Sequence, residues 1–272
     1  RNKMILAVDV SNTCTTLGCV ERHSGEIRIT AQLASDRRRT ADEYAILLHN
    51  LFVLHQTDPH EMEGCILSSV VPSLTPLVRQ ALERVTGKKV MVVGAGVKTG
   101  LNILIDNPAQ LGSDMVAMAV AALALYPKPV LIFDLSTATT LSVLDAKGGY
   151  LGGMIMPGPS LGMEALSQSA AQLPHISFEP PRRLIATNTV ECMKSGYIYG
   201  TAAMLDGVIA RIEEKLGEKA SVVATGSQAS DIVRFCKRKM VFEPNLRLIG
   251  LRLIYNRNTE AENRDKNKIE RA

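Results

Sequence analysis

Two segments of this chain share one pattern, in which an apolar strand runs into an aspartate and then into a short turn rich in hydroxyl side chains. The first copy spans residues 5–13 and carries Asp9, and the second spans residues 130–140 and carries Asp134. The two aspartates lie nearly half of the 272 residues apart. Because each copy leads into another apolar strand, the repeat predicts two similar half-molecules that face one nucleotide.

An aspartate at the end of a strand suits a metal–phosphate site. Its carboxylate can hold a hydrated cation, while the turn donates backbone N–H groups and hydroxyls to phosphate oxygens. The side chains that would line the phosphates are Ser11, Asn12 and Thr13 in the first copy and Ser136, Thr137, Thr139 and Thr140 in the second. The alternative is structural, because the same residue types dominate ordinary turns between strands. One copy leaves both interpretations open, whereas the repeat favours the functional one.

The composition supports a substantial apolar core in a chain long enough for two compact domains. Hydrophobic residues make up 46% of the sequence, but aromatic residues make up only 4% and tryptophan is absent, so the core must rest on Ala, Val, Ile and Leu. The net charge is +4, and basic residues run together at 37–39 and 237–239. Since no aromatic side chains interleave with them to stack on bases, we expect solvated faces and no nucleic-acid partner.

Cysteine and histidine spacing indicates neither a disulfide framework nor a zinc site. The five cysteines are odd in number and form no CxxC pair, and the five histidines lack metal-ligand spacing. No apolar run approaches the length of a membrane span, and the first residues lack a signal-peptide pattern. We therefore expect a protein of the reducing cytoplasm with no membrane partner.

Hydrophobic periodicity divides each half of the chain into three strands followed by helices and further strands. In the first half we expect strands at 4–10, 15–21, 26–33, 64–71 and 89–93, and helices at 40–55 and 72–85. In the second half we expect strands at 130–135, 139–144, 150–156 and 221–224, and helices at 160–169, 188–216, 228–237 and 245–255. Thr40, with Glu43 three residues later, predicts a capping box at the first helix.

An alanine-rich helix at 113–125 connects the halves, and a helix that crosses between two sheet domains is a good place for a cleft. Asp114 lies in its first turn, where it either complements the helix dipole or projects into the cleft as a general base. Thr189 has a similar ambiguity, because it either caps the helix at 188–216 or touches a substrate. Asn188 would serve equally well as that cap.

Taken together, these segments resemble the type III pantothenate kinase family of the actin-like ATPase superfamily. The resemblance covers about residues 4–258. Its motifs, in family order, are Asp9-Val10-Ser11-Asn12-Thr13, Ser68-Ser69-Val70-Val71-Pro72, Lys98-Thr99-Gly100-Leu101, Asp106-Asn107-Pro108, Gly112-Ser113-Asp114, Asp134 through Thr140, Gly152-Gly153 through Pro157-Gly158, Asn188-Thr189-Val190-Glu191 and Gly250-Leu251-Arg252.

The resemblance implies an α/β fold of two similar RNase H-like domains, each a mixed sheet flanked by helices. We place the N-terminal domain at residues 1–112 and the C-terminal domain, including the connecting helix, at 113–257. The remaining segment, 258–272, is almost entirely polar, and we expect it to be a frayed helix or a disordered tail.

The family phosphorylates the primary hydroxyl of pantothenate with ATP, the first step of coenzyme A synthesis, and the resemblance implies the same for this chain. It implies that Asp114 is the general base, that Asp134 holds a monovalent cation (K⁺ or NH₄⁺), and that Asp9 meets Mg²⁺ through ATP. The implied ATP-binding residues are Asp9, Val10, Ser11, Asn12, Thr13, Cys14, Thr15, Thr16 and Thr137. The implied substrate-binding residues are Ile105, Gly112, Ser113, Met115 and Thr189. A homodimer with its active site near the subunit interface is implied as well.

On the nucleotide side, the chain departs from the family at three turns. Ser11 and Ser136 stand where the family usually has glycine, and a late glycine pair is reduced to Gly226-Ser227. Each change adds a side chain where the backbone normally approaches the nucleotide. The added serine either donates its hydroxyl to phosphate or clashes and forbids a positive φ.

On the substrate side, Met115 stands in place of an arginine, Ile105 in place of a tyrosine and Met118 in place of an asparagine, so we expect a less polar pocket. A guanidinium pairs with a carboxylate or a phosphate oxygen, and a thioether does not. Losing such a contact typically lowers binding or rate by about 10²-fold.

Two interpretations of these departures remain. In the first, the chain is a working kinase in which another basic residue, such as Lys98 or an arginine of the partner subunit, compensates. In the second, it is a divergent paralogue that phosphorylates another small hydroxy acid or binds nucleotide as a regulator. The retention of Asp9, Asp114 and Asp134 favours the kinase, since functional sites tolerate local departures from the usual rules.

Overall fold

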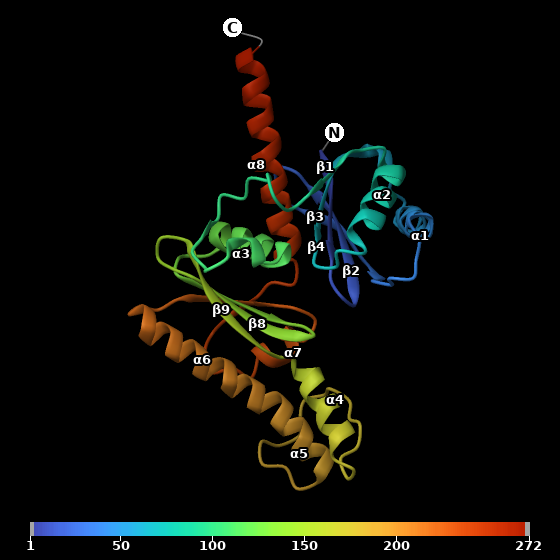
Figure 1. The fold of residues 1–272 in the computed structure, drawn as a ribbon. Coiled ribbons are helices and arrows are strands. Elements are labelled where there is room, and N and C mark those ends of the chain that lie inside the picture. Colours follow the sequence, from blue (N-terminus) through green and yellow to red (C-terminus); the bar gives the residue numbers. More distant parts are fainter. Residues whose placement is uncertain (1–2, 270–272) are drawn as a thin grey trace. The chain divides into compact units, whose positions relative to one another are not determined.

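The computed structural model describes residues 3–269 and divides the chain into two compact units (Figure 1). The first unit comprises the chain up to Leu101, the segment Asn107–Ala121 and the chain from Leu246 onward. The second unit comprises Asn102–Asp106 and Ala122–Asn245. Each unit is built around one β-sheet, which confirms the predicted α/β class.

The first unit holds a five-stranded mixed sheet with the strand order β3-β2-β1-β4-β5. Three consecutive strands form an antiparallel meander: β1 (Met4–Val10), β2 (Cys14–Glu21) and β3 (Ile27–Ala34). β4 (Met62–Ser69) then pairs in parallel with β1, and β5 (Val90–Val92) pairs in parallel with β4. Two helices lie between these strands in the chain, α1 (Ala41–Leu54) and α2 (Thr75–Thr86).

The predicted capping box at the start of α1 is confirmed. The Thr40 hydroxyl accepts a hydrogen bond from the Glu43 N–H at 3.3 Å, and the Glu43 carboxylate accepts one from the Thr40 N–H at 2.7 Å. In contrast, α2 begins three residues after its predicted start at Pro72. Residues 72–74 form a turn instead, in which the Leu74 N–H donates to the Val71 carbonyl at 2.9 Å.

The two faces of the first sheet are covered by different helices. On β1 the alternate side chains Leu6, Val8 and Val10 enter a core cluster with residues of α1 and α2. Asp9 lies between them in the sequence and therefore points to the opposite face. Helix α8 (Leu246–Ile269) contacts β1, β2 and β4, and Figure 1 shows it on the side of the sheet away from α1 and α2.

The second unit holds a six-stranded sheet with the order β11-β10-β7-β8-β9-β6. Its antiparallel strands are β7 (Val130–Leu135), β8 (Ala138–Leu144) and β9 (Gly149–Pro157). Parallel partners are β10 (Ser221–Thr225), β11 (Val241–Phe242) and β6 (Asn102–Ile103). Its helices are α4 (Pro159–Ser169), α5 (Thr189–Ser195), α6 (Thr201–Leu216) and α7 (Ala229–Val233), and α3 (Ser113–Leu125) spans the division between the units.

The final helix is longer than the apolar pattern at 245–255 predicts. Residues 258–269, predicted to be a frayed helix or a disordered tail, continue α8, and 270–272 lie outside the described residues. Polar side chains at the start of this segment have partners, since Asn258 Nδ2 donates to the Lys98 carbonyl at 2.9 Å and the Thr259 hydroxyl meets Arg22 Nη2 at 2.8 Å. The helix from Leu246 also groups with the first unit, whereas the predicted boundary assigned residues 113–257 to the C-terminal domain.

Three smaller differences concern local elements. The predicted helix at 188–216 is interrupted by a π-helical turn at Gly196–Gly200, and the two-residue strands β6 and β11 were too short for periodicity to indicate. The predicted helix at 228–237 is reduced to α7.

No helix in the part of the chain that the structure describes combines the length and the apolar composition that a membrane span needs.

Candidate active site

Asp9 lies one residue before the end of β1, with only 1% of its surface exposed. Its neighbour in the parallel register with β4 is Ser68. After Asp9 the chain turns tightly, because the Ser11 N–H donates to the Cys14 carbonyl at 2.9 Å, and the Ser11 hydroxyl points back to Asp9 Oδ2 at 3.3 Å. The strand end and the turn predicted from sequence are therefore both present.

The Asp9 carboxylate is held in a low-dielectric environment. Burial raises its pKa above the ordinary value, Arg247 lowers it, the Asp114 carboxylate raises it further, and hydrogen bonds from Ser68 and Ser11 lower it. Its Oδ1 atom is buried and has no hydrogen-bond partner among the described residues. Buried polar atoms nearly always have a partner, so this oxygen is placed to meet a bound cation or the water around one.

Asp114 is the second residue of α3, and Ser113 fixes the start of that helix on β4. The Ser113 hydroxyl lies 2.9 Å from the Ser68 hydroxyl, accepts from the Ser69 N–H at 3.2 Å and donates to the Ser69 carbonyl at 3.2 Å. The Asp114 Oδ1 atom accepts a hydrogen bond from the Met115 N–H at 2.8 Å. The side chain remains 18% exposed, so unlike Asp9 it is open to solvent and to a ligand.

Arg247 joins the two carboxylates and was not among the predicted site residues. Its Nη1 lies 3.3 Å from Asp9 Oδ2, and its Nη2 lies 3.9 Å from Asp114 Oδ2. Three charged groups that are far apart in the sequence, on β1, α3 and α8, therefore meet within the first unit.

A close contact between two helices brings Arg247 level with Asp114. Gly250 of α8 packs on the backbone of α3, where an added Cβ would lie 1.8 Å from the Ala117 carbonyl oxygen. Arg247 and Asp114 each precede this contact by three residues, and helical residues three apart share a face. The sequence analysis noted the motif that contains Gly250. Arg247 lies three residues before Gly250, and this helical spacing is the sequence feature that could have indicated the arginine.

The remaining residues of the segment 9–16 differ in how exposed they are to a nucleotide. Asn12 and Thr13 are exposed, and Asn12 Oδ1 accepts a hydrogen bond from Arg37 Nη2 at 3.3 Å. The side chain of Val10 is buried in the core, and the buried Thr15 hydroxyl lies 2.9 Å from the Ser35 hydroxyl. Of the predicted segment 9–16, the exposed tip of the turn is thus the part available to phosphates. Cys14 and Thr16 are partly buried.

The serines at the usual glycine positions do not strain the backbone. Gln56 is the single non-glycine residue with a positive φ in the part of the chain that the structure describes, so neither Ser11 nor Ser136 adopts the left-handed region. In the turn after β10, where a positive φ is required, the chain has kept glycine. Gly226 has φ +99°, and an added Cβ would lie 2.4 Å from the Leu135 carbonyl oxygen and 2.6 Å from Asp134 Oδ1.

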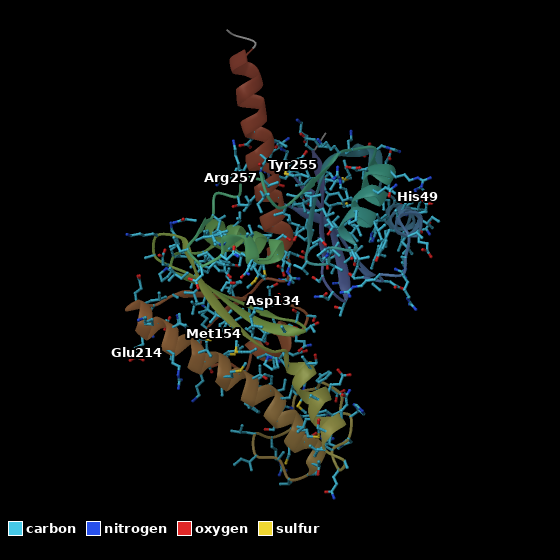
Figure 2. The ribbon with its side chains drawn as sticks, viewed as in Figure 1. His49, Asp134, Met154, Glu214, Tyr255 and Arg257 are labelled. Carbon is cyan, nitrogen blue, oxygen red and sulfur yellow. The ribbon has the colours of Figure 1, made fainter. Side chains whose placement is uncertain are left out.

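In the second unit, Asp134, which is labelled in Figure 2, lies one residue before the end of β7, and Asp9 has the same position in β1. It is 4% exposed and pairs in register with Thr140 on β8 and Thr225 on β10. Thr139, which precedes Thr140 on β8, is fully buried on the opposite face of the sheet from Asp134, and its hydroxyl has no hydrogen-bond partner among the described residues. Thr137, at the tip of the turn, is exposed, and its carbonyl accepts from the Gly158 N–H at 3.1 Å.

Thr189 is exposed at the start of α5, and it does not cap that helix. The Asn188 side chain is the cap, since its Oδ1 accepts from the Glu191 N–H at 3.0 Å. Thr189 instead lines an open hollow of about 690 Å³ within the second unit, together with Met163, Leu166, Tyr197 and other side chains.

The predicted substrate residues are divided between the two units. Gly112, Ser113 and Met115 belong to the first unit and Ile105 to the second. Met115 is partly exposed beside Asp114, as a substrate contact would require. Met118 is 1% exposed and packs in the interior, so its effect on the polarity of the pocket stays a prediction.

The oxygen atoms at Asp9 suit a cation whose other ligands come from a bound phosphate group and from water. No group of three His, Cys, Asp or Glu side chains that could bind a metal occurs among the described residues. Asp9 offers one buried oxygen without a partner, which fits an ion that takes its other ligands from phosphate and water.

Comparison with solved structures supports the fold. The chain has a TM-score of 0.53 with the ROK hexokinase from Thermus thermophilus, at 13% identity, covering 94% of this chain and 99% of that one. It has a TM-score of 0.52 with a ROK family glucokinase from Streptomyces griseus, at 11% identity, covering 92% and 97%. These are sugar kinases of the actin-like ATPase fold, and at such identities the likeness shows the fold alone.

Comparison with protein sequences is more specific. Residues 5–211 match the family described as type III pantothenate kinase. The chain is 41% identical over 256 residues to the type III pantothenate kinase of Moorella thermoacetica, covering 94% of this chain and 100% of that protein. It is 42% identical over 255 residues to that of Myxococcus xanthus, covering 94% and 99%. This chain belongs to the type III pantothenate kinase family.

Proposed function

We propose that this chain transfers the γ-phosphoryl group of ATP to the primary hydroxyl of pantothenate, the first step of coenzyme A synthesis. The observation that carries the proposal is the meeting of Asp9 and Asp114 around Arg247 in a chain of this family. One carboxylate follows the phosphate-binding strand, and the other is open to an acceptor alcohol. Phosphoryl transfer needs little more than such positioning and charge neutralisation.

In the proposed reaction, the pantothenate hydroxyl oxygen forms a bond to the γ-phosphorus while the bond from that phosphorus to the β–γ bridging oxygen breaks. The hydroxyl proton passes to the Asp114 carboxylate, and ADP leaves. Asp114 suits this role because it is partly exposed and anchored at the start of α3 by Ser113.

Asp9 and the tip of its turn would hold the Mg²⁺–ATP phosphates. Mg²⁺ neutralises phosphate charge when bound, and the partnerless Asp9 Oδ1 is the atom placed to meet it or its water. Exposed N–H groups and side chains of Asn12 and Thr13 would donate to phosphate oxygens.

In the second unit, Asp134 would hold the monovalent cation, K⁺ or NH₄⁺. The supporting observations are that Asp134 is buried near the end of β7, as Asp9 is near the end of β1, and that it pairs in register with Thr140 and Thr225. The exposed Thr137 would contact ATP, and the exposed Thr189 would contact pantothenate. We further propose that the protein is a cytoplasmic homodimer, with its active site near the subunit interface.

An ADP-release assay with Mg²⁺, K⁺ and ATP tests this function. We expect release that depends on pantothenate and that falls by about 10²-fold or more in Asp114→Asn, while ATP affinity is retained. Unchanged turnover in Asp114→Asn would contradict the assignment of Asp114 as the general base.

Met115 favours a second candidate function, because no guanidinium stands at this family position to meet an acidic substrate. The chain would then phosphorylate another small hydroxy acid or bind nucleotide without transfer. A panel of hydroxy acids in the same assay would reveal the first. ATP binding with no turnover on any of them would identify the second.

A further inference from the structure

The position of Arg247 leads to an inference that rests on the function proposed above. We propose that Arg247 binds the γ-phosphoryl group of ATP as that group passes to the acceptor hydroxyl. The arginine is a further catalytic residue that the sequence did not indicate, and its ligand is a terminal phosphoryl group.

The Arg247 guanidinium pairs with both carboxylates of the site. The guanidinium lies 3.3 Å from Asp9 and 3.9 Å from Asp114. In the proposed reaction, Asp9 lies on the side of the nucleotide phosphates, and Asp114 takes the proton of the attacking hydroxyl. The γ-phosphorus must therefore lie close to both carboxylates during the transfer. A cation that touches both therefore lies where the transferred group passes.

The placement of Arg247 on its helix is unusual in a way that supports a functional role. It is the second residue of α8, where the positive end of the helix dipole disfavours a cation. Its side chain is only 23% exposed, so the charge is also partly desolvated. A residue that breaks two local rules at a site with two carboxylates is typical of a functional position.

The chemistry of the side chain fits the proposed ligand. A planar guanidinium matches a phosphate in a bidentate manner and carries its charge at every working pH. Charge in the transferring phosphoryl group spreads over three equatorial oxygens, and arginine is the residue that proteins commonly use to stabilise it. Without nucleotide the guanidinium pairs with Asp9 and Asp114, and with nucleotide a change of rotamer turns it to the phosphoryl oxygens. Arg247 also supplies a guanidinium beside Asp114 in a chain where Met115 does not.

Nucleotide binding tests the proposal without any turnover. Calorimetry would compare a non-hydrolysable ATP analogue with ADP on the wild-type chain, on Arg247→Ala and on Arg247→Lys. Arg79→Met is the matched control, since Arg79 is a half-exposed arginine of α2 that pairs with Glu83. We expect Arg247→Ala to weaken the analogue by about tenfold or more, and ADP much less, because ADP lacks the γ-phosphoryl group. Arg247→Lys should recover part of the loss. Equal losses for both nucleotides would overturn the proposal.

Turnover gives a second readout that a structural role would not move. In Arg247→Ala we expect kcat to fall by about 10²-fold or more with little change in the KM for pantothenate. Added guanidinium ion should restore part of kcat, and methylammonium should not. A rise in kcat would contradict the proposal, because it would show that the pairing of Arg247 with Asp9 and Asp114 inhibits the enzyme. If the wild-type chain does not phosphorylate pantothenate, the proposed function fails, while the binding comparison still decides the role of Arg247.

Discussion

At the residue scale, the site holds a carboxyl group where water hardly reaches it. Asp9 is 1% exposed, and one of its oxygens has no partner among the described residues. Its pKa is raised mainly by burial, and Arg247 only partly offsets that effect. A ligand-binding role explains why the chain keeps a residue that weakens the folded state.

Replacing this carboxylate should therefore stabilise the protein. A pKa raised on folding means that the folded state is favoured when Asp9 is protonated, and that this advantage is lost as the pH rises through the folded pKa. We expect Asp9→Asn to raise the melting temperature at pH 7, with a smaller gain at pH 4.5, in thermal unfolding followed by circular dichroism. An equal or lower melting temperature at pH 7 would contradict the assignment of Asp9 as a destabilising buried charge. The variant should also lose ATP-dependent turnover.

Met115 is the residue that most distinguishes the substrate side. It is partly exposed next to Asp114, so a longer cationic side chain has room to reach a ligand. Met115→Arg should lower the KM for pantothenate, by about tenfold if a charge-assisted pair forms with its carboxylate. Leu125→Arg, at the other end of α3 and 48% exposed, adds the same charge as a control and should leave KM unchanged. An unchanged KM in Met115→Arg would remove the argument for a lost guanidinium.

At the element scale, α8 is the helix on which the first-unit site depends, because it carries Arg247 and covers the sheet face of Asp9. Its middle is anchored by Arg22 of the turn after β2, which is 6% exposed. Arg22 donates to Asn256 Oδ1 at 3.1 Å and to Thr259 Oγ1 at 2.8 Å, pairs with Glu63, and lies over the Tyr255 ring with 5.7 Å to the centroid.

Removing this anchor should loosen α8 without touching the site. We expect Arg22→Met to lower the free energy of unfolding by about 2–3 kcal/mol, since it leaves Glu63 without its buried partner. Arg84→Met breaks an exposed pair with Asp42 and should have almost no effect. Chemical denaturation of both variants gives the comparison. Equal stability of the two variants would show that the Arg22 network does not hold the helix.

The same helix shows what sequence reasoning reached and what it missed. Local rules predicted the strands that carry Asp9 and Asp134 and the cap at Thr40, because alternation and capping are encoded within a few residues. Arg247 was missed because its role arises from a contact between Gly250 and Ala117, which lie far apart in the sequence. For the segment after 258, the sequence left a frayed helix and a disordered tail open, because a polar segment gives no apolar period. Its first side chains find partners only in the fold.

At the scale of the whole molecule, each half of the chain builds a mixed sheet in which a central strand ends in a buried aspartate. The predicted likeness of the halves is confirmed at this level, although the boundary between them is not a single point in the sequence. The second unit also exposes apolar side chains on β9, where Ile155 is 80% exposed and Leu151 is 41% exposed.

These exposed side chains are candidates for the interface of the proposed homodimer. Large apolar side chains exposed on one strand are candidates for a protein contact. We expect the wild-type protein to sediment as a dimer and Ile155→Glu to shift it toward monomer. Val53→Glu, at an exposed apolar position of α1, is the control and should leave the dimer intact. A wild-type monomer at micromolar concentration would contradict the proposed assembly.

The measurement that tests the central claim most directly is identification of the product. Purified chain, ATP, Mg²⁺, K⁺ and pantothenate would be incubated and analysed by mass spectrometry, with Asp114→Asn in parallel. We predict phosphopantothenate formed in equal amount to ADP by the wild-type chain, and a loss of about 10²-fold or more in the variant. ATP binding without any phosphopantothenate, or equal product from both proteins, would contradict the account.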